Sequence, residues 1–270
     1  MTSGTPVARI VPASGFAGRR ARHLVERNFM VYRRAWMVVF SGFFEPIFYL
    51  FSVGIGIGQL VGDVTGPGGQ PISYAAFVAP ALLASSAMNG AIYESTMNIF
   101  FKMKFSKIYD AILATPVSPL DIAVGEISWS LLRGALYAVA FLTVVIVMGL
   151  MQSVWGLLAI PAALLIGFAF GAVGMAATTY MRTWQDFDLI QLVTLPLFLF
   201  SATFYPLDVY PRTMQIITQF SPLYHGTVLI RSLMLGDVSV GLLGHVLFLV
   251  VMGLVGTVVA GRRLGTLLLK

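Results

Sequence analysis

Six long runs of apolar residues divide this 270-residue chain and constrain its fold more than any other feature. A helix of about 20 apolar residues crosses the hydrocarbon core of a bilayer, because each residue adds about 1.5 Å. Backbone groups in lipid must hydrogen-bond within the protein, so continuous apolar runs predict helices, whereas a barrel would need alternating residues. We expect spans at residues 35–60, 73–101, 122–151, 154–181, 189–207 and 238–260.

The composition supports a membrane protein. The chain is 58% hydrophobic and 10% charged, with a mean hydropathy of +0.87, whereas a soluble domain carries about 25% charged residues. We therefore predict an all-α polytopic membrane protein, with residues 35–270 forming a six-helix transmembrane domain. Residues 1–34 are predicted to be a cytoplasmic tail that ends in an amphipathic interfacial helix; the alternative is a solvated basic tail.

The basic residues predict the orientation of the spans. With the N-terminus in the cytoplasm, fifteen of the seventeen Lys and Arg residues lie on the cytoplasmic side, and Arg212 and Arg231 lie outside. Cytoplasmic loops carry such an excess of positive charge. We expect a multi-pass protein of the cytoplasmic membrane, in contact with lipid, with both termini cytoplasmic. The net charge of +6 then follows from topology and predicts no nucleic-acid partner.

The segment between the second and third spans predicts a short amphipathic helix. Its apolar stripe has the spacing i, i+3, i+4 and i+7 of one helix face and consists of Phe105, Ile108, Tyr109 and Ile112. The helix should end at Thr115-Pro116. Ser118 and Asp121 then form a capped start of the third span. The stripe can dock on a partner or lie on the membrane surface, and the residues alone leave both open.

Two half-helices are predicted before the last span. Residues 211–220 and 222–235 are separated at Ser221-Pro222, and Gly236 ends the second. Each is too short to cross a bilayer. We expect an outer re-entrant helical pair, the alternative being two helices that lie flat on the outer surface.

Two of these segments resemble ABC-2-type exporter permeases. Residues 107–126, KIYDAILATPVSPLDIAVGE, resemble the cytoplasmic loop of that family, with Thr115, Pro116 and Ser118 matching its TP-x-S element. A second match is SPLYHGTVLIRSLMLGD near the C-terminus, where the family's outer segment has counterparts in Pro222, Tyr224 and Arg231. Residues 45–58, EPIFYLFSVGIGIG, are similar to the branch of nodulation lipo-oligosaccharide and daunorubicin-type drug exporters.

The resemblance implies a function. Such a chain is the transmembrane subunit of an ATP-driven exporter of a drug, a lipid or a lipid-linked saccharide. It works with two ABC ATPase subunits and a second permease, identical or homologous. The sequence lacks G-x-x-x-x-G-K-[ST], so ATP and Mg²⁺ should bind the partner, and the chain alone should be neither an enzyme nor a cofactor-binding protein. The ATPase-docking residues of the coupling helix would be Phe105, Ile108, Tyr109, Asp110, Ile112, Leu113, Thr115 and Pro116.

Acidic residues inside the spans are candidates for the substrate path. Glu45 and Glu94 lie within predicted spans, where an ionisable group usually faces protein or water and has a function. Phe44 and Phe198 could add apolar surface to the same path. Structural hydrogen bonding is the alternative for both acids. If they serve transport, Glu45→Gln and Glu94→Gln should impair transport more than folding.

The remaining polar residues give little sign of chemistry. Glu126 and Arg133 lie near the cytoplasmic end of the third span and are expected to reach headgroups or to bond locally. The three histidines are far apart in the sequence, and no metal site is predicted. Two rivals remain open, namely a secondary transporter or channel without an ATPase partner, and an intramembrane enzyme or assembly factor.

Overall fold

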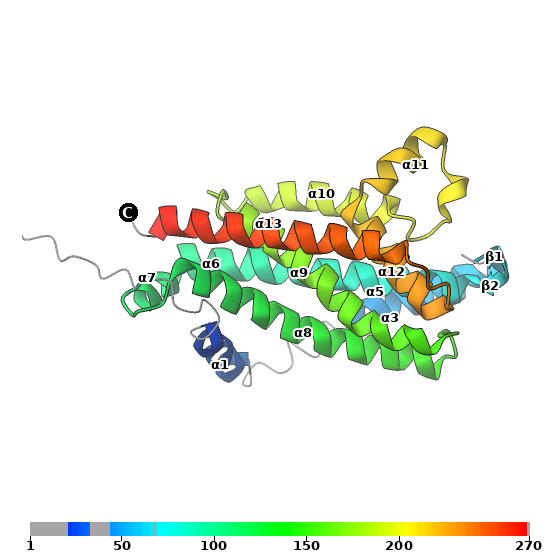
Figure 1. The fold of residues 1–270 in the computed structure, drawn as a ribbon, viewed down its shortest axis with the longest axis horizontal. Helices are drawn as coiled ribbons and strands as arrows, with labels where there is room; N and C mark the ends of the chain where they lie inside the picture. The colour runs from blue at the N-terminus through cyan, green and yellow to red at the C-terminus, as the bar shows by residue number, and fades with distance from the viewer. Residues whose placement is uncertain (1–20, 33–43, 67–68, 269–270) are drawn as a thin grey trace, which may run out of the picture.

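The computed structural model describes residues 21–32, 44–66 and 69–268, which form a bundle of long helices (Figure 1). The predicted tail, the first nine residues of the first span and the proposed boundary at residue 34 lie outside the described residues. A helix, α1 (Ala21–Tyr32), is present within the segment predicted to be an interfacial helix; its place at the membrane surface stays a prediction. Leu24 and Asn28 are buried, whereas Phe29 is exposed and remains available to lipid.

Five helical segments in the described part of the chain are long and apolar enough to cross a membrane. They are Phe44–Val61, Tyr74–Lys104, Pro119–Val147, Val154–Thr178 and Leu242–Leu267. These segments match the first, second, third, fourth and sixth predicted spans, so an all-α polytopic membrane protein is confirmed.

The elements within these segments are as follows. The first segment consists of α3 (Phe44–Tyr49), the π-helix η1 (Leu50–Ile57) and α4 (Gly58–Val61). The second consists of α5 (Tyr74–Tyr93), the π-helix η2 (Glu94–Asn98) and α6 (Ile99–Lys104). The others are α8 (Pro119–Val147), the 3₁₀-helix η3 (Val154–Leu158) with α9 (Ala159–Thr178), and α13 (Leu242–Leu268).

A small hairpin joins the first two segments. Strands β1 (Asp63–Thr65) and β2 (Pro71–Ser73) pair antiparallel, with Val64 opposite Ile72. The hairpin lies at the end of the bundle opposite to α7 (Figure 1). It leads directly into α5, because the Ser73 hydroxyl accepts a hydrogen bond from the Ala76 amide at 3.3 Å and caps that helix.

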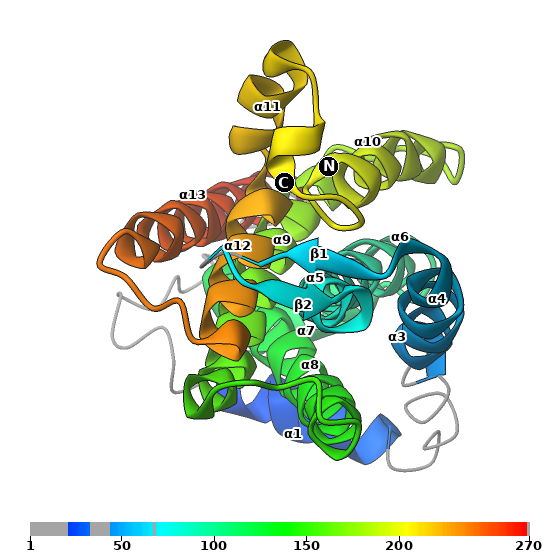
Figure 2. The ribbon, with the colours of Figure 1, turned by 90° about the vertical axis from the view of Figure 1, so that its right-hand side faces the viewer.

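Helix α9 occupies the centre of the bundle, with α5, α8 and α13 around it (Figure 2). Small residues allow this close packing. A Cβ atom placed on Gly171 would lie 3.7 Å from the Cβ of Ala91 on α5, and one on Gly256 would lie 2.8 Å from the backbone of Ala172. Larger side chains at these two glycines would push the neighbouring helices apart.

The fifth predicted span differs from the structure. Helix α10 covers Asp186–Phe200, so it begins three residues earlier and ends seven residues earlier than expected. Its fifteen residues reach about 22 Å, which is less than the hydrocarbon thickness of about 30 Å. The helix ends because the Arg231 guanidinium donates to the Ala202 carbonyl at 2.7 Å, and the Ser201 and Ser221 hydroxyls bond at 2.6 Å.

The two half-helices before the last span form as predicted. After the short 3₁₀-helix η4 (Leu207–Val209), α11 covers Arg212–Gln219 and α12 covers Pro222–Leu235. Ser221 caps α12, and Gly236, at φ 89°, ends it. Helix α12 packs inside the bundle against α5, α9 and α13, while α11 projects from it (Figures 1 and 2). The alternative that both helices lie flat on the outer surface therefore does not hold for α12. Re-entrance of the pair into a bilayer stays a prediction.

Candidate functional site

The short helix predicted between the second and third spans is present and is joined by a short turn to α8; its role in coupling stays a prediction. Helix α7 covers Ile108–Leu113 and lies at the same end of the bundle as α1 (Figure 1). The capping box is confirmed, because the Asp121 amide donates to the Ser118 hydroxyl at 3.1 Å and the Ser118 amide donates to the Asp121 carboxylate at 3.0 Å. Only the five residues 114–118 separate α7 from α8.

The apolar stripe of α7 already has a partner within the chain. Tyr109 is 0% exposed and Leu113 is 9% exposed, and both join an apolar cluster that includes Ile122 of α8 and Leu264 of α13. Docking on a partner and lying on the membrane surface both require an exposed side chain, and Tyr109 is buried within the chain instead. Of the predicted docking residues, two are half-buried and four are exposed. The half-buried residues are Ile108 and Ile112, and the exposed residues are Phe105, Asp110, Thr115 and Pro116.

A buried carboxylate connects α7 to three other helices. Glu126 of α8, which is 3% exposed, accepts hydrogen bonds from the Tyr109 hydroxyl at 3.1 Å and from the Asn28 amide of α1 at 2.9 Å. The Lys102 ammonium of α6 forms an ion pair with it at 2.7 Å. We call these four residues the α7 network. Glu126 thus bonds to protein groups that lie 17, 24 and 98 residues away, whereas the sequence predicted a headgroup contact or a local bond.

The α7 network keeps Tyr109 in its neutral form. Burial raises the pKa of the Tyr109 phenol well above its ordinary value, and the nearby Glu126 charge raises it further. A neutral phenol keeps the proton that it donates to the carboxylate. Asn28 and Lys102 could not be recognised from the sequence as partners of Glu126, because they lie 98 and 24 residues from it and no local pattern joins them.

A second feature is a cavity half-way along the bundle. It measures about 590 Å³ and opens between α3, α5, α8, α9 and α10. Asn89 lies on its wall at the middle of the segment Tyr74–Lys104. A smaller hollow of about 140 Å³ shares Glu45, Ser86 and Asn89 with it. We call the two hollows together the mid-span cavity.

Glu94 and Arg133 form an ion pair on the wall of the mid-span cavity. Glu94 is 5% exposed, and the Arg133 guanidinium also donates to the Tyr137 hydroxyl at 3.2 Å. The sequence placed Arg133 near headgroups or local partners, but its carboxylate partner lies 39 residues away on η2. Glu94 therefore has a structural partner as well as a place on the cavity wall.

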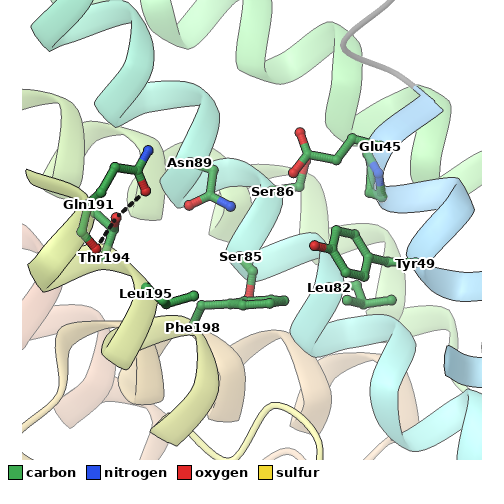
Figure 3. Close-up of a pocket in the computed structure, with 11 residues that line it drawn as sticks. Glu45, Tyr49, Leu82, Ser85, Ser86, Asn89, Gln191, Thr194, Leu195 and Phe198 are labelled. Carbon is green, nitrogen blue, oxygen red and sulfur yellow. Dashed lines mark hydrogen bonds between the residues drawn. The ribbon is translucent and has the colours of Figure 1, made fainter. Parts of the chain in front are cut away.

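Glu45 and Phe198 line opposite parts of the mid-span cavity (Figure 3). The Glu45 carboxylate extends from α3 toward Ser86 and Asn89, and Phe198 reaches in from α10. Its ring contacts the Tyr49 ring edge-on, with the centroids 5.8 Å apart. Phe44 stacks on Phe48 instead and is absent from the described lining.

The outer residues suggested by the resemblance have structural contacts. Pro222 starts α12. Arg231 is 6% exposed; its guanidinium donates to the Phe77 carbonyl at 3.1 Å and lies 3.8 Å from the Phe77 ring centroid. Although the histidines are far apart in the sequence, His225 and His245 share a hydrogen bond of 2.7 Å between their Nδ1 atoms, beside Tyr224. No group of three metal ligands occurs in the described chain.

Comparison with known proteins gives one consistent result. A family model described as ABC-2 type transporter matches residues 19–235. Nodulation protein J of Rhizobium leguminosarum bv. trifolii is 33% identical over 244 residues, covering 88% of this chain and 91% of that protein. Nodulation protein J of Rhizobium meliloti (strain 1021) is 31% identical over 220 residues, covering 80% and 82%. With its apolar helices and its capped helices α8 and α12, the chain is a multi-pass permease that belongs to the ABC-2 type transporter family.

Proposed function

We propose that this chain is the transmembrane subunit of an ABC exporter that moves an amphipathic substrate across the cytoplasmic membrane. The substrate class is a drug, a lipid or a lipid-linked saccharide. The observation that carries the proposal is the mid-span cavity, whose wall combines two kinds of surface. Glu45, Asn89 and Gln191 offer polar groups, while Tyr49 and Phe198 offer aromatic surface.

Such a wall suits a molecule with a polar head and an apolar body. The polar side chains satisfy a head group that lipid alone would leave without hydrogen bonds. The aromatic side chains remove the apolar body from water at about 25 cal/mol per Å². A cavity at the middle of the spans can therefore bind an amphiphile that has left one side of the membrane and has not yet been released on the other.

The energy would come from two ATPase subunits that bind two permeases. In this proposal a separate ATPase contacts the exposed residues of α7 and its flanking turns, which include Phe105, Asp110 and Thr115. ATP and Mg²⁺ would bind that subunit. The second permease would be identical or homologous to this chain.

Helix α8 provides the route from the ATPase to the cavity. Glu126 holds α7 to α8 through Tyr109, and Arg133 lies on the cavity wall seven residues further along the same helix. Seven residues form about two turns and span about 10 Å. A push on α7 would therefore move α8, and the cavity would change the side to which it opens, as in other two-state switches.

Reconstitution tests the proposed function. The permease and its ATPase are placed in inside-out vesicles, and uptake of a fluorescent alkylamine is followed with and without ATP. We expect uptake only with ATP and with an ATPase that can hydrolyse it. The matched control is the same permease with an ATPase that lacks its catalytic carboxylate. Uptake that follows an ion gradient without ATP would instead favour a secondary transporter.

A further inference from the structure

The mid-span cavity has an unequal distribution of charge. Three charged side chains line it in the described part of the chain: Glu45, Glu94 and Arg133. Glu94 and Arg133 form an ion pair, and their side chains are only 7% and 15% exposed. Their charges compensate each other, so Glu45 remains as the charge that a bound molecule would encounter.

Glu45 is exposed within this space. It belongs to the first turn of α3, and its carboxylate extends into the hollow toward Ser86 and Asn89 (Figure 3). Within the described ranges, the four ion pairs involve other residues. Residues 35–43, which precede it in the sequence, contain no Lys or Arg. Arg33 and Arg34, which precede that segment, lie outside the described residues. Among the described residues, the open cavity offers a route by which a cation can reach this carboxylate.

The neighbours of Glu45 accept such a ligand without supplying a charge. Ser86, Asn89, Gln191 and Thr194 are neutral groups that donate or accept hydrogen bonds. Gln191 is itself within 3.3 Å of the Thr194 hydroxyl. On the other side, Tyr49 and Phe198 form an aromatic surface that contacts an apolar body and also attracts a cation above its rings.

We infer that the mid-span cavity prefers amphiphiles with a cationic head group, such as a protonated amine, and that Glu45 determines this preference. The inference rests on the proposed function, whose substrate class it narrows. The ammonium would bond the Glu45 carboxylate, and the alkyl body would lie against the aromatic surface. A hydrogen bond between two charged groups is about twice as strong as one between neutral groups, and in a cavity of low polarity the Coulomb attraction is larger than in water.

Binding to the purified permease tests the inference directly. Three fluorescent probes share one alkyl chain and differ only in the terminal group, which is a primary amine, its N-acetylated amide or a carboxylate. The permease is placed in nanodiscs of neutral phosphatidylcholine, so that lipid charge does not attract the amine. Binding is measured by fluorescence polarisation, and discs without protein provide the blank.

We expect the amine to bind about tenfold more tightly than the amide, which corresponds to the strength of a charge-assisted hydrogen bond, and the carboxylate to bind most weakly. Glu45→Gln should remove the difference between amine and amide, while Glu45→Asp should keep most of it. Glu26→Gln is the matched control, because it neutralises an exposed carboxylate on α1, and it should bind as the unmodified chain does.

Two results would overturn the inference: equal binding of amine and amide, or an amine preference that survives Glu45→Gln. Failure of the proposed function would be seen in a different measurement, because the proposed function concerns uptake driven by ATP and the inference concerns binding. A chain that selects the amine in nanodiscs but moves none of the probes in vesicles with its ATPase would keep the inference and reject the proposed function.

Discussion

The α7 network and the mid-span cavity each contain a glutamate of a predicted span, but the two acids have opposite surroundings. In the α7 network both carboxylate oxygens of Glu126 accept hydrogen bonds, from Tyr109 on one side and from Asn28 and Lys102 on the other. In the cavity the Glu45 carboxylate faces open space (Figure 3). An acid whose bonds are all made within its own chain fixes helices to one another, whereas an open acid is free to bind a substrate.

Glu94 shows that position in a span does not decide between these roles. Like Glu45 it lines the cavity, but like Glu126 it is buried and paired. Burial makes an unpaired charge very unfavourable, so a buried acid needs its partner even before any transport occurs. The following predictions test whether buried, paired acids and the open acid differ in this way.

The largest effect is expected at the Glu94–Arg133 pair. Arg133→Gln leaves the Glu94 carboxylate buried without its cation, and removing one partner of a buried pair costs about 3–5 kcal/mol. Glu94→Gln should destabilise the chain similarly, so the structure favours a folding defect over the transport defect predicted from the sequence. The measurement is thermal unfolding of the detergent-solubilised chain, followed by tryptophan fluorescence.

The double variant Glu94→Gln/Arg133→Gln shows whether the loss of stability comes from an unpaired charge or from the changed shape of the side chains. It removes both charges and should recover at least half of the lost stability. Arg212→Gln serves as the control, because Arg212 is an exposed cation on α11, and it should unfold as the unmodified chain does. Single variants as stable as this control would mean that the pair contributes nothing to folding.

A smaller loss is expected for Glu126→Ala. Asn28 and Tyr109 would lose their acceptor while buried, and Lys102 would lose its counter-ion, although its side chain is 14% exposed and can move toward water. We expect a loss of about 2 kcal/mol. Hydrogen exchange should then become faster in α1 and α7 together, while Glu126→Gln, which keeps an acceptor oxygen, should show a weaker change. Unchanged exchange in α1 would show that the Asn28 bond is not needed.

The exposed face of α7 is expected to matter for assembly and not for folding. Asp110→Arg reverses a charge on the surface that remains available to a partner. We expect the affinity for the ATPase to fall about tenfold, which is about 1.4 kcal/mol, with thermal stability unchanged. Co-purification and ATPase coupling measure it, and Arg212→Glu on α11 is the matched charge reversal. Intact assembly of Asp110→Arg would move the docking site elsewhere, most plausibly to α1.

Tyr109→Phe removes one hydrogen bond and one titratable group. At neutral pH the loss should be about 1 kcal/mol. Because burial raises the pKa of the Tyr109 phenol above its unfolded value of about 10, the stabilisation by the neutral phenol is fully present below that pH. It is lost as the pH rises through the folded pKa.

The alkaline range therefore tests the same residue a second time. The unmodified chain should lose more stability than Tyr109→Phe between about pH 9 and about pH 12, since only the unmodified chain ionises at this position. Thermal unfolding of both proteins across this range gives the difference, in which the titration of the lysines cancels. Parallel curves would show that Tyr109 is not held in its neutral form.

Local patterns predicted much of this fold. Hydropathy located five spans, the stripe around Ile108 predicted α7, and Ser118 with Asp121 predicted the start of α8. The early end of α10 was not predictable, because Arg231 bonds the Ala202 carbonyl from 29 residues away. A short polar stretch inside an apolar run does not by itself predict the end of a helix, because the group that bonds the stretch lies on another helix.

The candidate site was predicted only in part for the same reason. Glu45 and Phe198, the candidates for the substrate path, both line the cavity, since an acid and an aromatic residue in spans are recognisable one at a time; their part in transport stays a prediction. Arg133 bonds Glu94 from 39 residues away, and the partners of Glu126 lie 17, 24 and 98 residues away. The periodicity of the sequence does not encode such pairings. The pairings decide which acid is buried and paired and which acid is open to the cavity.

The smallest effect on stability is expected for Glu45→Gln. Its carboxylate faces the cavity and has no ion pair within the described chain, so the free energy of unfolding should change by less than about 0.5 kcal/mol. Measured beside Glu94→Gln under the same conditions, it gives the sharpest contrast between an open acid and a paired one. Transport should respond in the opposite order, because Glu45 is the acid that a substrate can contact. A loss of stability as large as that of Glu94→Gln would mean that Glu45 has a structural partner in residues 33–43, and the distinction between the two acids would then fail.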